Sequence, residues 1–462
     1  MKIKLTRPST AQEIKRIIGA DLSPDIDPMQ PLYFIATHSD EVEENTLFFS
    51  FTGEHTSGEC FHPSVLQRGG FIVSEKGCPK GFAVSSVTEA LFRLAKNHLK
   101  SLSNLKRKIC ITGSVGKTTT KEVLRRLLSK HLAVHATEGN QNSEIGLPLT
   151  VLCAPENTEI LLLEAGMNHS GEIARLSRLV EPDLAIITSI GHAHIGNLGS
   201  REAIAQAKKE ILLGAAENAV ALIPADEPLL KDVDGARTVA LFTDRGDYML
   251  TRENGNTFFE AKDVRFAFCA DMTDPAMLSA CAFSAAAALE LGIPASSIES
   301  EIQKFKSNIF RQKREIANGL EIIFDAYNAS FESVLNAISH LCRPEKNQAC
   351  ALVLGDMREL GAYADTLNRS VAAALAAHQK NIDFLFLFGE NADTIAAYAV
   401  EAGFSHSRIF VNNHSDRPED TANAILQKMK GGTRIVIKGA RGMRMERIFD
   451  LLTEDKGGDT NA

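Results

Sequence analysis

The sequence lacks the features that mark secreted and membrane proteins. Its eight cysteines form no C-x-x-C pair, and several lie in apolar runs where cysteine acts as a small hydrophobic residue. Neither a disulfide framework nor a zinc site is therefore indicated. No apolar run reaches the roughly 18 residues of a membrane-spanning helix, and the first 20 residues contain no signal-peptide core. We expect a cytoplasmic protein without stable membrane insertion.

Positive charge is also scarce. Lys and Arg number 50 against 58 Asp and Glu, which gives a net charge of −8, and no basic stripe is evident. This balance argues against nucleic-acid binding, which needs clustered cations to contact phosphates. The hydrophobic content of 44% is that of a globular protein, and 462 residues exceed one typical core. We expect two or three domains.

The chain divides into three segments by its pattern. Residues 1–84 hold short strand-like runs broken by turn residues. In residues 85–310 the order strand, glycine loop, helix recurs, which predicts a parallel, doubly wound sheet with an apolar helix at 275–292. Residues 311–462 repeat the alternation with five strand-like runs, which is typical of a Rossmann-like domain. The predicted fold class is α/β throughout.

One short stretch, ICITGSVGKTTTKEVL at 109–124, predicts a phosphate-binding loop. A strand that ends in a glycine-rich turn opening a helix directs backbone N–H groups and the helix dipole at an anion. Lys117 would add a charge on the β- and γ-phosphates, and Thr118 would ligate Mg²⁺. A strict Walker A sequence needs glycine at Ile111, so this loop is a shorter variant. The alternative is an ordinary strand-to-helix turn with a solvated lysine.

Three polar residues at or beyond strand ends are candidate metal ligands. Glu164 closes an apolar strand, where a carboxylate is costly to bury unless it is paired or bound to metal. His194 follows the next predicted strand, and Lys208 lies in a helical stretch. Each also has an ordinary interpretation, respectively a helix cap, a loop histidine and a surface charge. Their location in one domain with the phosphate loop favours a site.

Seven segments follow one another in order along residues 107–446: TGSVGKTTTKE, GNQNSEIGLPLT, LEAGMNHSGEI, AHIGNLGSREAIAQAKKEIL, DAYNAS, LGDMREL and KGARGMRME. Together they resemble the motifs of the Mur ligases, and so many ordered motifs are highly specific. Within that family the similarity is strongest to the branch that joins D-Ala-D-Ala to a UDP-N-acetylmuramoyl-tripeptide in peptidoglycan synthesis.

The resemblance implies three domains and one reaction. A small α/β N-terminal domain (1–84) would bind the UDP-sugar substrate, a central P-loop ATPase-type parallel sheet (85–310) would bind ATP, and a C-terminal Rossmann-like domain (311–462) would bind the incoming amine. ATP would phosphorylate a substrate carboxylate, and the amine would displace phosphate to form an amide. The implied cofactors are ATP and two Mg²⁺ ions, and the implied state is a cytoplasmic monomer.

Site residues follow from the resemblance by motif position. Thr118 and Glu164 would hold one Mg²⁺, and His194 would help hold a second. Lys208 occupies the position of a carbamylated lysine that also serves as a metal ligand, and the neighbouring Lys209 is expected on the surface. The residues implied in catalysis are Lys117, His194 and Lys208.

Other residues are implied in binding. Those assigned to the nucleotide are Gly113, Ser114, Gly116, Lys117, Thr118, Thr119, Asn140, Asn142, Arg311, Asp325 and Asn328. Those assigned to the substrates are Ser39, Lys438 and Arg441. Because two domains contribute, the resemblance implies closure about a hinge near residues 308–313.

The N-terminal segment departs most from the family pattern. Asp40, in THSDEV, stands where a cation or neutral residue is expected beside the substrate diphosphate, and a carboxylate there would be repulsive. A Mur-like paralogue that joins another carboxylate to another amine is therefore an alternative. A non-catalytic ATP-binding regulator is a second alternative, against which the retained Lys117, Glu164 and Lys208 argue.

Overall fold

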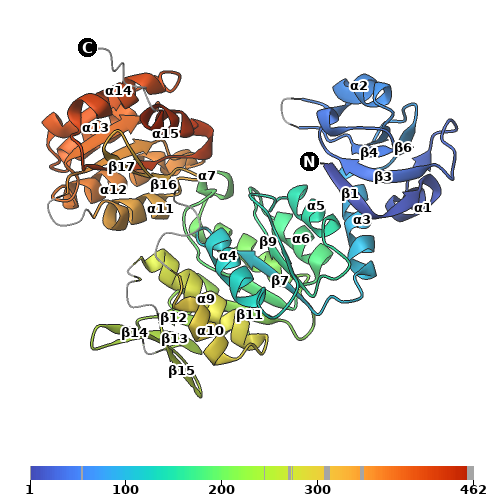
Figure 1. Ribbon diagram of the computed structural model, residues 1–462, viewed down its shortest axis with the longest axis horizontal. Coiled ribbons are helices and arrows are strands. Elements are labelled where there is room, and N and C mark those ends of the chain that lie inside the picture. The colour runs from blue at the N-terminus through green and yellow to red at the C-terminus, as the bar shows by residue number, and fades with distance from the viewer. Residues whose placement is uncertain are drawn as a thin grey trace, which may run out of the picture.

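Three β-sheets follow one another along the chain and lie side by side in the molecule (Figure 1). The computed structural model describes residues 2–53, 56–243, 245–268, 272, 274–305, 313–343 and 348–454. Each sheet mixes strands with covering helices, so the predicted α/β fold class with three sheet-containing regions is confirmed.

The first region is a six-stranded sheet in the order β1-β3-β4-β5-β6-β2. Its helix α1 begins with a capping box in which Thr10 and Glu13 bond each other's backbone N–H groups. Its strands are β1 (Lys2–Thr10), β2 (Asp21–Leu22), β3 (Pro31–Ala36), β4 (Thr46–Phe49), β5 (Phe71–Ser74) and β6 (Gly81–Ala83), and its helices are α1 (Ala11–Ile18) and α2 (His62–Gln67).

The second region is a nine-stranded sheet in the order β15-β14-β13-β12-β11-β10-β7-β9-β8. Strands β7 to β13 pair in parallel, as predicted, whereas β14 pairs antiparallel with both β13 and β15. Its strands are β7 (Arg107–Thr112), β8 (Val134–Ala136), β9 (Ile160–Glu164), β10 (Leu184–Ile187), β11 (Val220–Pro224), β12 (Arg237–Leu241), β13 (Tyr248–Glu253), β14 (Asn256–Ala261) and β15 (Val264–Ala267).

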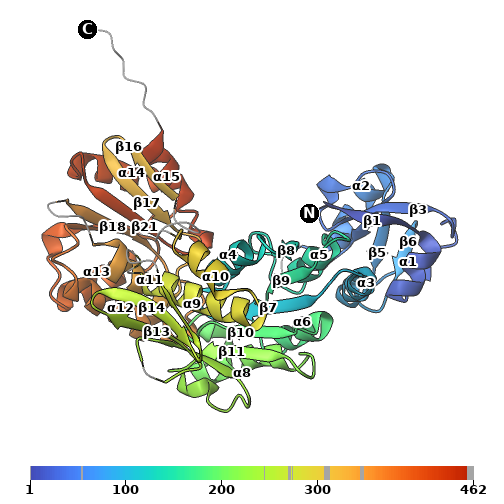
Figure 2. The ribbon, with the colours of Figure 1, turned by 60° about the horizontal axis from the view of Figure 1, so that its bottom comes forward.

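Helices cover this sheet and join it to the first region. Helix α3 packs against α1 on one side and α5 and α6 on the other. Helix α4 packs against the apolar α9, where Ser284 Oγ donates to Thr120 O at 3.1 Å (Figure 2). The helices are α3 (Val87–Ser101), α4 (Lys117–Leu128), α5 (Gly146–Leu152), α6 (Glu172–Val180), α7 (Ile195–Leu198), α8 (Arg201–Lys209), α9 (Pro275–Glu290) and α10 (Ala295–Ile302).

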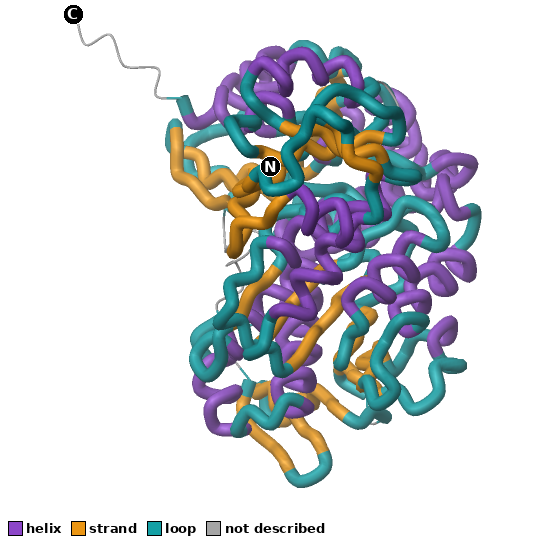
Figure 3. The backbone as a smooth tube through the Cα atoms, turned by 90° about the vertical axis from the view of Figure 1, so that its right-hand side faces the viewer, coloured by secondary structure: helices purple, strands orange, loops and turns teal. Residues whose placement is uncertain are grey.

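The third region is a six-stranded sheet in the order β16-β17-β21-β18-β19-β20. The five predicted runs form its parallel strands, and β16 adds an antiparallel edge. Helices surround its strands in Figure 1, and in Figure 3 this region lies behind the first one. The elements are β16 (Lys313–Ala317), β17 (Leu320–Asp325), α11 (Phe331–Asn336), β18 (Cys350–Gly355), α12 (Ala364–Ala377), β19 (Phe384–Phe388), α13 (Ala392–Glu401), β20 (Ile409–Asn412), α14 (Pro418–Lys428), β21 (Arg434–Lys438) and α15 (Glu446–Thr453).

This topology sets where a site can form. Strands β7, β9 and β10 are parallel neighbours, so their carboxyl ends meet at one edge, and β17 and β21 likewise end together. Ligands of open α/β sheets bind beyond such ends. Among the described residues, no helix is both long and apolar enough to cross a membrane.

Candidate functional site

The loop between β7 and α4 is held in one conformation by residues that follow β10. Ser114 N donates to Ser189 O at 3.0 Å, and Thr188 Oγ1 donates to Val115 O at 2.6 Å. Gly113 has φ +149°, and a Cβ there would lie 1.9 Å from Thr188 Oγ1. Only glycine fits that close approach. The loop therefore presents a fixed set of backbone donors at the start of α4.

Two side chains at the start of α4 face the same space. Lys117 Nζ donates to Gly113 O at 2.5 Å, so the side chain folds back onto the loop. Thr118 Oγ1 donates to Glu164 Oε2 at 2.9 Å. Glu164 is only 1% exposed, and its other oxygen, Oε1, makes no hydrogen bond to any described residue. A buried carboxylate oxygen without a donor suits a cation, so this pair fits a Mg²⁺ ion.

A second lysine of α4, Lys121, also reaches Glu164. It is 1% exposed, and its Nζ lies 3.6 Å from Glu164 Oε1 and 2.8 Å from Glu122 Oε1. The sequence analysis missed this residue. A usable signal was available, because Lys121 occupies the same helix face as the buried Leu124 and Leu128. A cation on an apolar helix face needs a partner.

Lys208 lies in α8, 2% exposed, and it does not line the cavity described below. Burial, followed by the positive charge of Lys117, holds the pKa of the Lys208 amine well below its ordinary value. Lys209, which was expected on the surface, is partly buried. Its side chain is 14% exposed and pairs with Asp232, because α8 packs beside the short helix η4 (Pro228–Leu230).

The loop that carries His194 joins the second and third regions. His194 Nδ1 lies 2.6 Å from Glu359 Oε2, and His192 Nδ1 lies 2.7 Å from Glu332 Oε1. Gly196 N donates to Glu359 O at 2.8 Å, and a Cβ on Gly196 would lie 2.6 Å from that oxygen. Sequence reasoning missed Glu332 and Glu359, although Glu359 lies in the motif LGDMREL.

The third region supplies a partly buried ion pair at the ends of β17 and β21. Asp325 and Lys438 are paired in register, and Lys438 Nζ donates to Asp325 Oδ2 at 3.1 Å and to Asn328 O at 2.7 Å. Lys438 is thus held by Asp325, a partner that sequence reasoning assigned to the nucleotide. Arg441 is exposed, with its guanidinium 5.6 Å from the ring centre of Tyr327.

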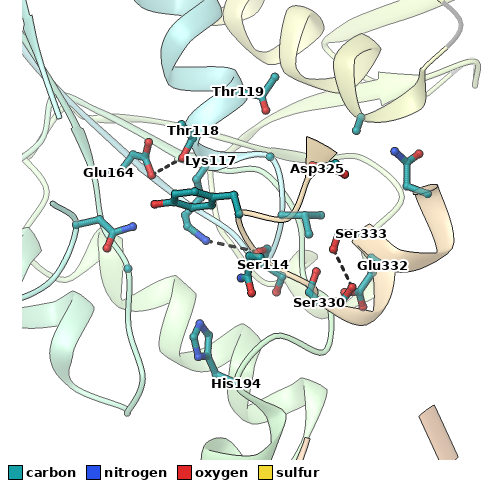
Figure 4. Close-up of a pocket in the computed structure, with 18 of the residues that line it drawn as sticks. Ser114, Lys117, Thr118, Thr119, Glu164, His194, Asp325, Ser330, Glu332 and Ser333 are labelled. Atoms are coloured by element: carbon teal, nitrogen blue, oxygen red, sulfur yellow. Dashed lines mark hydrogen bonds between the residues drawn. The ribbon is translucent and has the colours of Figure 1, made fainter. Parts of the chain in front are cut away.

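A cavity of about 550 Å³ lies where the two regions meet, and Figure 4 shows Glu164 and Thr118 on one side and Asp325 and Glu332 on the other. It is large enough for a nucleotide-sized ligand. Unpredicted residues Asp274 and Asn336 also line it. The predicted residues that line it are Ser114, Gly116, Lys117, Thr118, Thr119, Asn142, Glu164, His194, Asp325, Asn328 and Lys438.

The other predicted residues do not line this cavity. Gly113 lies behind the loop, where its carbonyl accepts from Lys117, and Asn140 is exposed and accepts from Asn142 N through its carbonyl oxygen. Arg311 and most of the expected hinge lie outside the described residues. In the described part of the chain, no three His, Cys, Asp or Glu side chains converge on one metal position.

Ser39 and Asp40 lie in the first region, in the 3-10 turn η1 (Ser39–Glu41). Ser39 is buried, whereas the Asp40 side chain is 75% exposed. Arg68 Nη1 donates to the backbone oxygen of Asp40 at 2.8 Å, and Arg68 Nη2 lies 3.8 Å from its carboxylate. A cation therefore stands beside the aspartate whose charge departs from the family pattern.

Comparisons with known proteins agree with this architecture. The Mur ligase middle domain matches residues 111–267, and the Mur ligase, glutamate ligase domain matches residues 310–441. The UDP-N-acetylmuramoyl-tripeptide–D-alanyl-D-alanine ligase of Bacillus subtilis is 34% identical over 457 residues, which cover 96% of this chain and 98% of the relative. The enzyme of the same name from Treponema pallidum is 30% identical over 446 residues, covering 91% and 94%.

Solved structures give the same result. MurF ligase from Thermotoga maritima, in complex with ADP, superposes with a TM-score of 0.76 at 29% identity, covering 90% of this chain and 96% of that one. MurF from Acinetobacter baumannii superposes with a TM-score of 0.85 at 24% identity, covering 97% and 100%, and so shares the fold. On the extent of these matches, the chain belongs to the Mur ligase family.

Proposed function

We propose that the protein is an ATP-dependent, ADP-forming ligase of peptidoglycan synthesis that joins D-Ala-D-Ala to UDP-N-acetylmuramoyl-tripeptide. The observation that carries the proposal is the shared cavity, which brings Lys117 and Glu164 of the second region together with Asp325 and Lys438 of the third. Relatives that span nearly the whole chain bear the name of this reaction, and the ADP complex of one supports nucleotide binding here.

The reaction needs a leaving group, because a carboxylate is a poor electrophile. The tripeptide carboxylate attacks the γ-phosphorus of ATP, an acyl phosphate forms, and ADP leaves. The amine of D-Ala-D-Ala then attacks the acyl carbon, phosphate departs with the bonding electrons, and the nitrogen loses a proton to water. Lys117 and the backbone donors of the loop stabilise the charge on the transferred phosphoryl group.

Thr118 and Glu164 are proposed to hold one Mg²⁺ and His194 to help hold a second. The ions, when bound, offset the repulsion between two anionic reactants. Glu164 Oε1, which accepts no hydrogen bond from a described residue, supports the first site. Lys208 is proposed to be carbamylated, since a lowered pKa leaves the amine neutral and able to attack CO₂, with loss of a proton. The carbamate would turn a cation into a carboxylate-like ligand.

Further assignments are part of the same proposal. We assign residues 1–84 to binding the UDP-sugar, with Ser39 near it. Residues 85–310 are assigned to binding ATP, and Asn140, Asn142 and Asn328 are placed near this nucleotide. Residues 311–462 are assigned to binding the amine, with Arg441 near it. The protein is proposed to act as a cytoplasmic monomer. Light scattering coupled to size exclusion tests the oligomeric state, and a mass that corresponds to two chains would contradict it.

The decisive experiment is phosphate release from ATP and Mg²⁺ with UDP-N-acetylmuramoyl-tripeptide, with and without D-Ala-D-Ala. Release that needs both substrates, with formation of the pentapeptide product, is the expected result. Release only with another carboxylate and amine would indicate a Mur-like paralogue. ATP binding without release under any pairing would indicate a regulator.

A further inference from the structure

Lys121 is a fully buried cation that the proposed reaction does not use. It lies one helical turn after Lys117 on α4 and is 1% exposed. Removing an ammonium from water is costly, so a buried lysine keeps its charge only where anions and carbonyl oxygens surround it. Its surroundings therefore indicate what the charge is for.

Three oxygens face the Lys121 ammonium. It donates to Thr137 O, lies 2.8 Å from Glu122 Oε1, and lies 3.6 Å from Glu164 Oε1. Glu122 is itself bound by Arg125 at 2.9 Å, so that carboxylate has a second cation. Glu164 has no other cation within ion-pair distance among the described residues.

Thr137 ties the same lysine to the backbone of Glu164. Its carbonyl accepts from Lys121, and its hydroxyl accepts from the Glu164 N–H at 3.0 Å. Three contacts therefore position Glu164. Thr137 binds its backbone N–H, Thr118 donates to Oε2, and the charge of Lys121 attracts Oε1. The distance of 3.6 Å leaves Oε1 without a hydrogen bond and so available to a second cation.

We propose that Lys121 is a positioning residue that holds Glu164 Oε1 ready for a divalent cation by charge, without using up the oxygen in a hydrogen bond. This inference rests on the proposed role of Glu164 as a metal ligand. It assigns a specific role to Lys121, the second lysine of the sequence KTTTKE (117–122). The phosphate-loop pattern alone gives this residue no role.

The test measures Mn²⁺ binding to the full-length protein in the presence of ADP, by the EPR signal of free Mn²⁺, so that turnover is not the readout. We expect Lys121→Met to weaken Mn²⁺ binding about tenfold, the scale seen when a residue that orients a metal ligand is removed. ADP affinity without metal should stay within twofold. Arg125→Met, which removes the other cation of Glu122, is the matched control and should bind Mn²⁺ like the wild type.

Two further variants separate the possible failures. Lys121→Gln keeps a donor for Thr137 O but has no charge, so it should also lose Mn²⁺ affinity, and it replaces Lys121→Met if that variant does not fold by circular dichroism. Wild-type or tighter binding in a folded, neutral variant would overturn the inference. If Glu164→Gln instead binds Mn²⁺ normally, the proposed metal site itself is wrong.

Discussion

At the scale of single residues, Lys117, Lys121 and Lys208 lie in or beside one site, yet each is held differently. Lys117 bonds the loop that it covers, and Lys121 is neutralised by carboxylates. Lys208 instead has its pKa lowered by burial and by the charge of Lys117. A lysine that is costly to protonate is suited to conversion into an anion.

The first prediction concerns Lys208. Lys208→Ala should reduce turnover by at least roughly 100-fold, the scale on which loss of one preorganised electrostatic group acts. Added short carboxylic acids should restore part of the rate by standing in for the carbamate. Lys209→Ala, a change at the next residue that only breaks a pair with Asp232, is the control in a phosphate-release assay. Normal turnover in Lys208→Ala would refute its assignment to the site.

At the scale of elements, helix α6 depends on a carboxylate from the short helix η3 (Glu210–Leu212). Glu210 accepts from Ser170 Oγ at 2.9 Å, Gly171 N at 2.7 Å and Ala174 N at 3.2 Å. It thereby satisfies N–H groups at the start of α6 that have no partner within the helix. The cavity-lining residues Gly166, Met167 and Asn168 immediately precede this cap.

We therefore predict that Glu210→Ala lowers the free energy of unfolding by about 1–2 kcal/mol, as loss of an N-terminal cap does. Urea unfolding followed by circular dichroism measures this change. Glu202→Ala, an exposed carboxylate at the start of α8, is the comparison and should change stability less. Equal effects of the two substitutions would show that the cap contributes nothing specific.

Helix α3 gives a prediction of pH dependence. His98 is buried, and desolvation lowers its pKa below 6.5 while its Nε2 lies 2.9 Å from Ala154 O. Because the unfolded chain takes up the proton first as pH falls, the stability from neutral His98 is present above pH 6.5 and is lost below it. Melting temperature should fall between pH 7.5 and 5.5, and less steeply in His98→Gln. The exposed His406→Gln should keep the wild-type slope.

Much of the architecture could be predicted from the sequence, because buried parallel strands are continuous apolar runs. The sequence analysis missed strands β13, β14 and β16, which instead belong to the hairpins β13–β14 and β16–β17 and have weaker patterns. Each has a two-residue Asn-Gly loop, Asn254-Gly255 and Asn318-Gly319, with positive φ at both positions. Asn-Gly between alternating residues is the strongest short hairpin signal. That signal was present in the sequence and would have found both.

The site was predictable only in part. The motifs identified some of the cavity-lining residues of the second region, among them Lys117, Thr118 and Glu164, because the phosphate loop and the strand ends are local features. The contacts of His192 with Glu332 and of His194 with Glu359 join residues about 140 and 165 positions apart. No local pattern contains such pairings, because they depend on how two separately formed sheets meet.

At the scale of the whole molecule, the meeting of the second and third regions controls the cavity. Gly196→Val should push Glu359 away, because even a Cβ at 2.6 Å from its carbonyl oxygen is too close. We predict an increased radius of gyration in small-angle X-ray scattering. We also predict that the KM for ATP rises roughly tenfold, because the cavity-lining residues of the two regions move apart. Gly77→Val, with open space around the added Cβ, is the control. An unchanged radius and KM would contradict a role for this contact.

The packing of α4 against α9 has a consequence for the order in which the protein is made. The phosphate-loop helix ends at Leu128, but the apolar helix that covers it ends at Glu290. At about 5–20 residues per second, a ribosome needs roughly 8–30 s to add the residues between them. During that interval the buried face of α4, with Val123, Leu124 and Leu127, lacks its cover. We therefore expect a nascent chain of this length to expose apolar surface that chaperones bind.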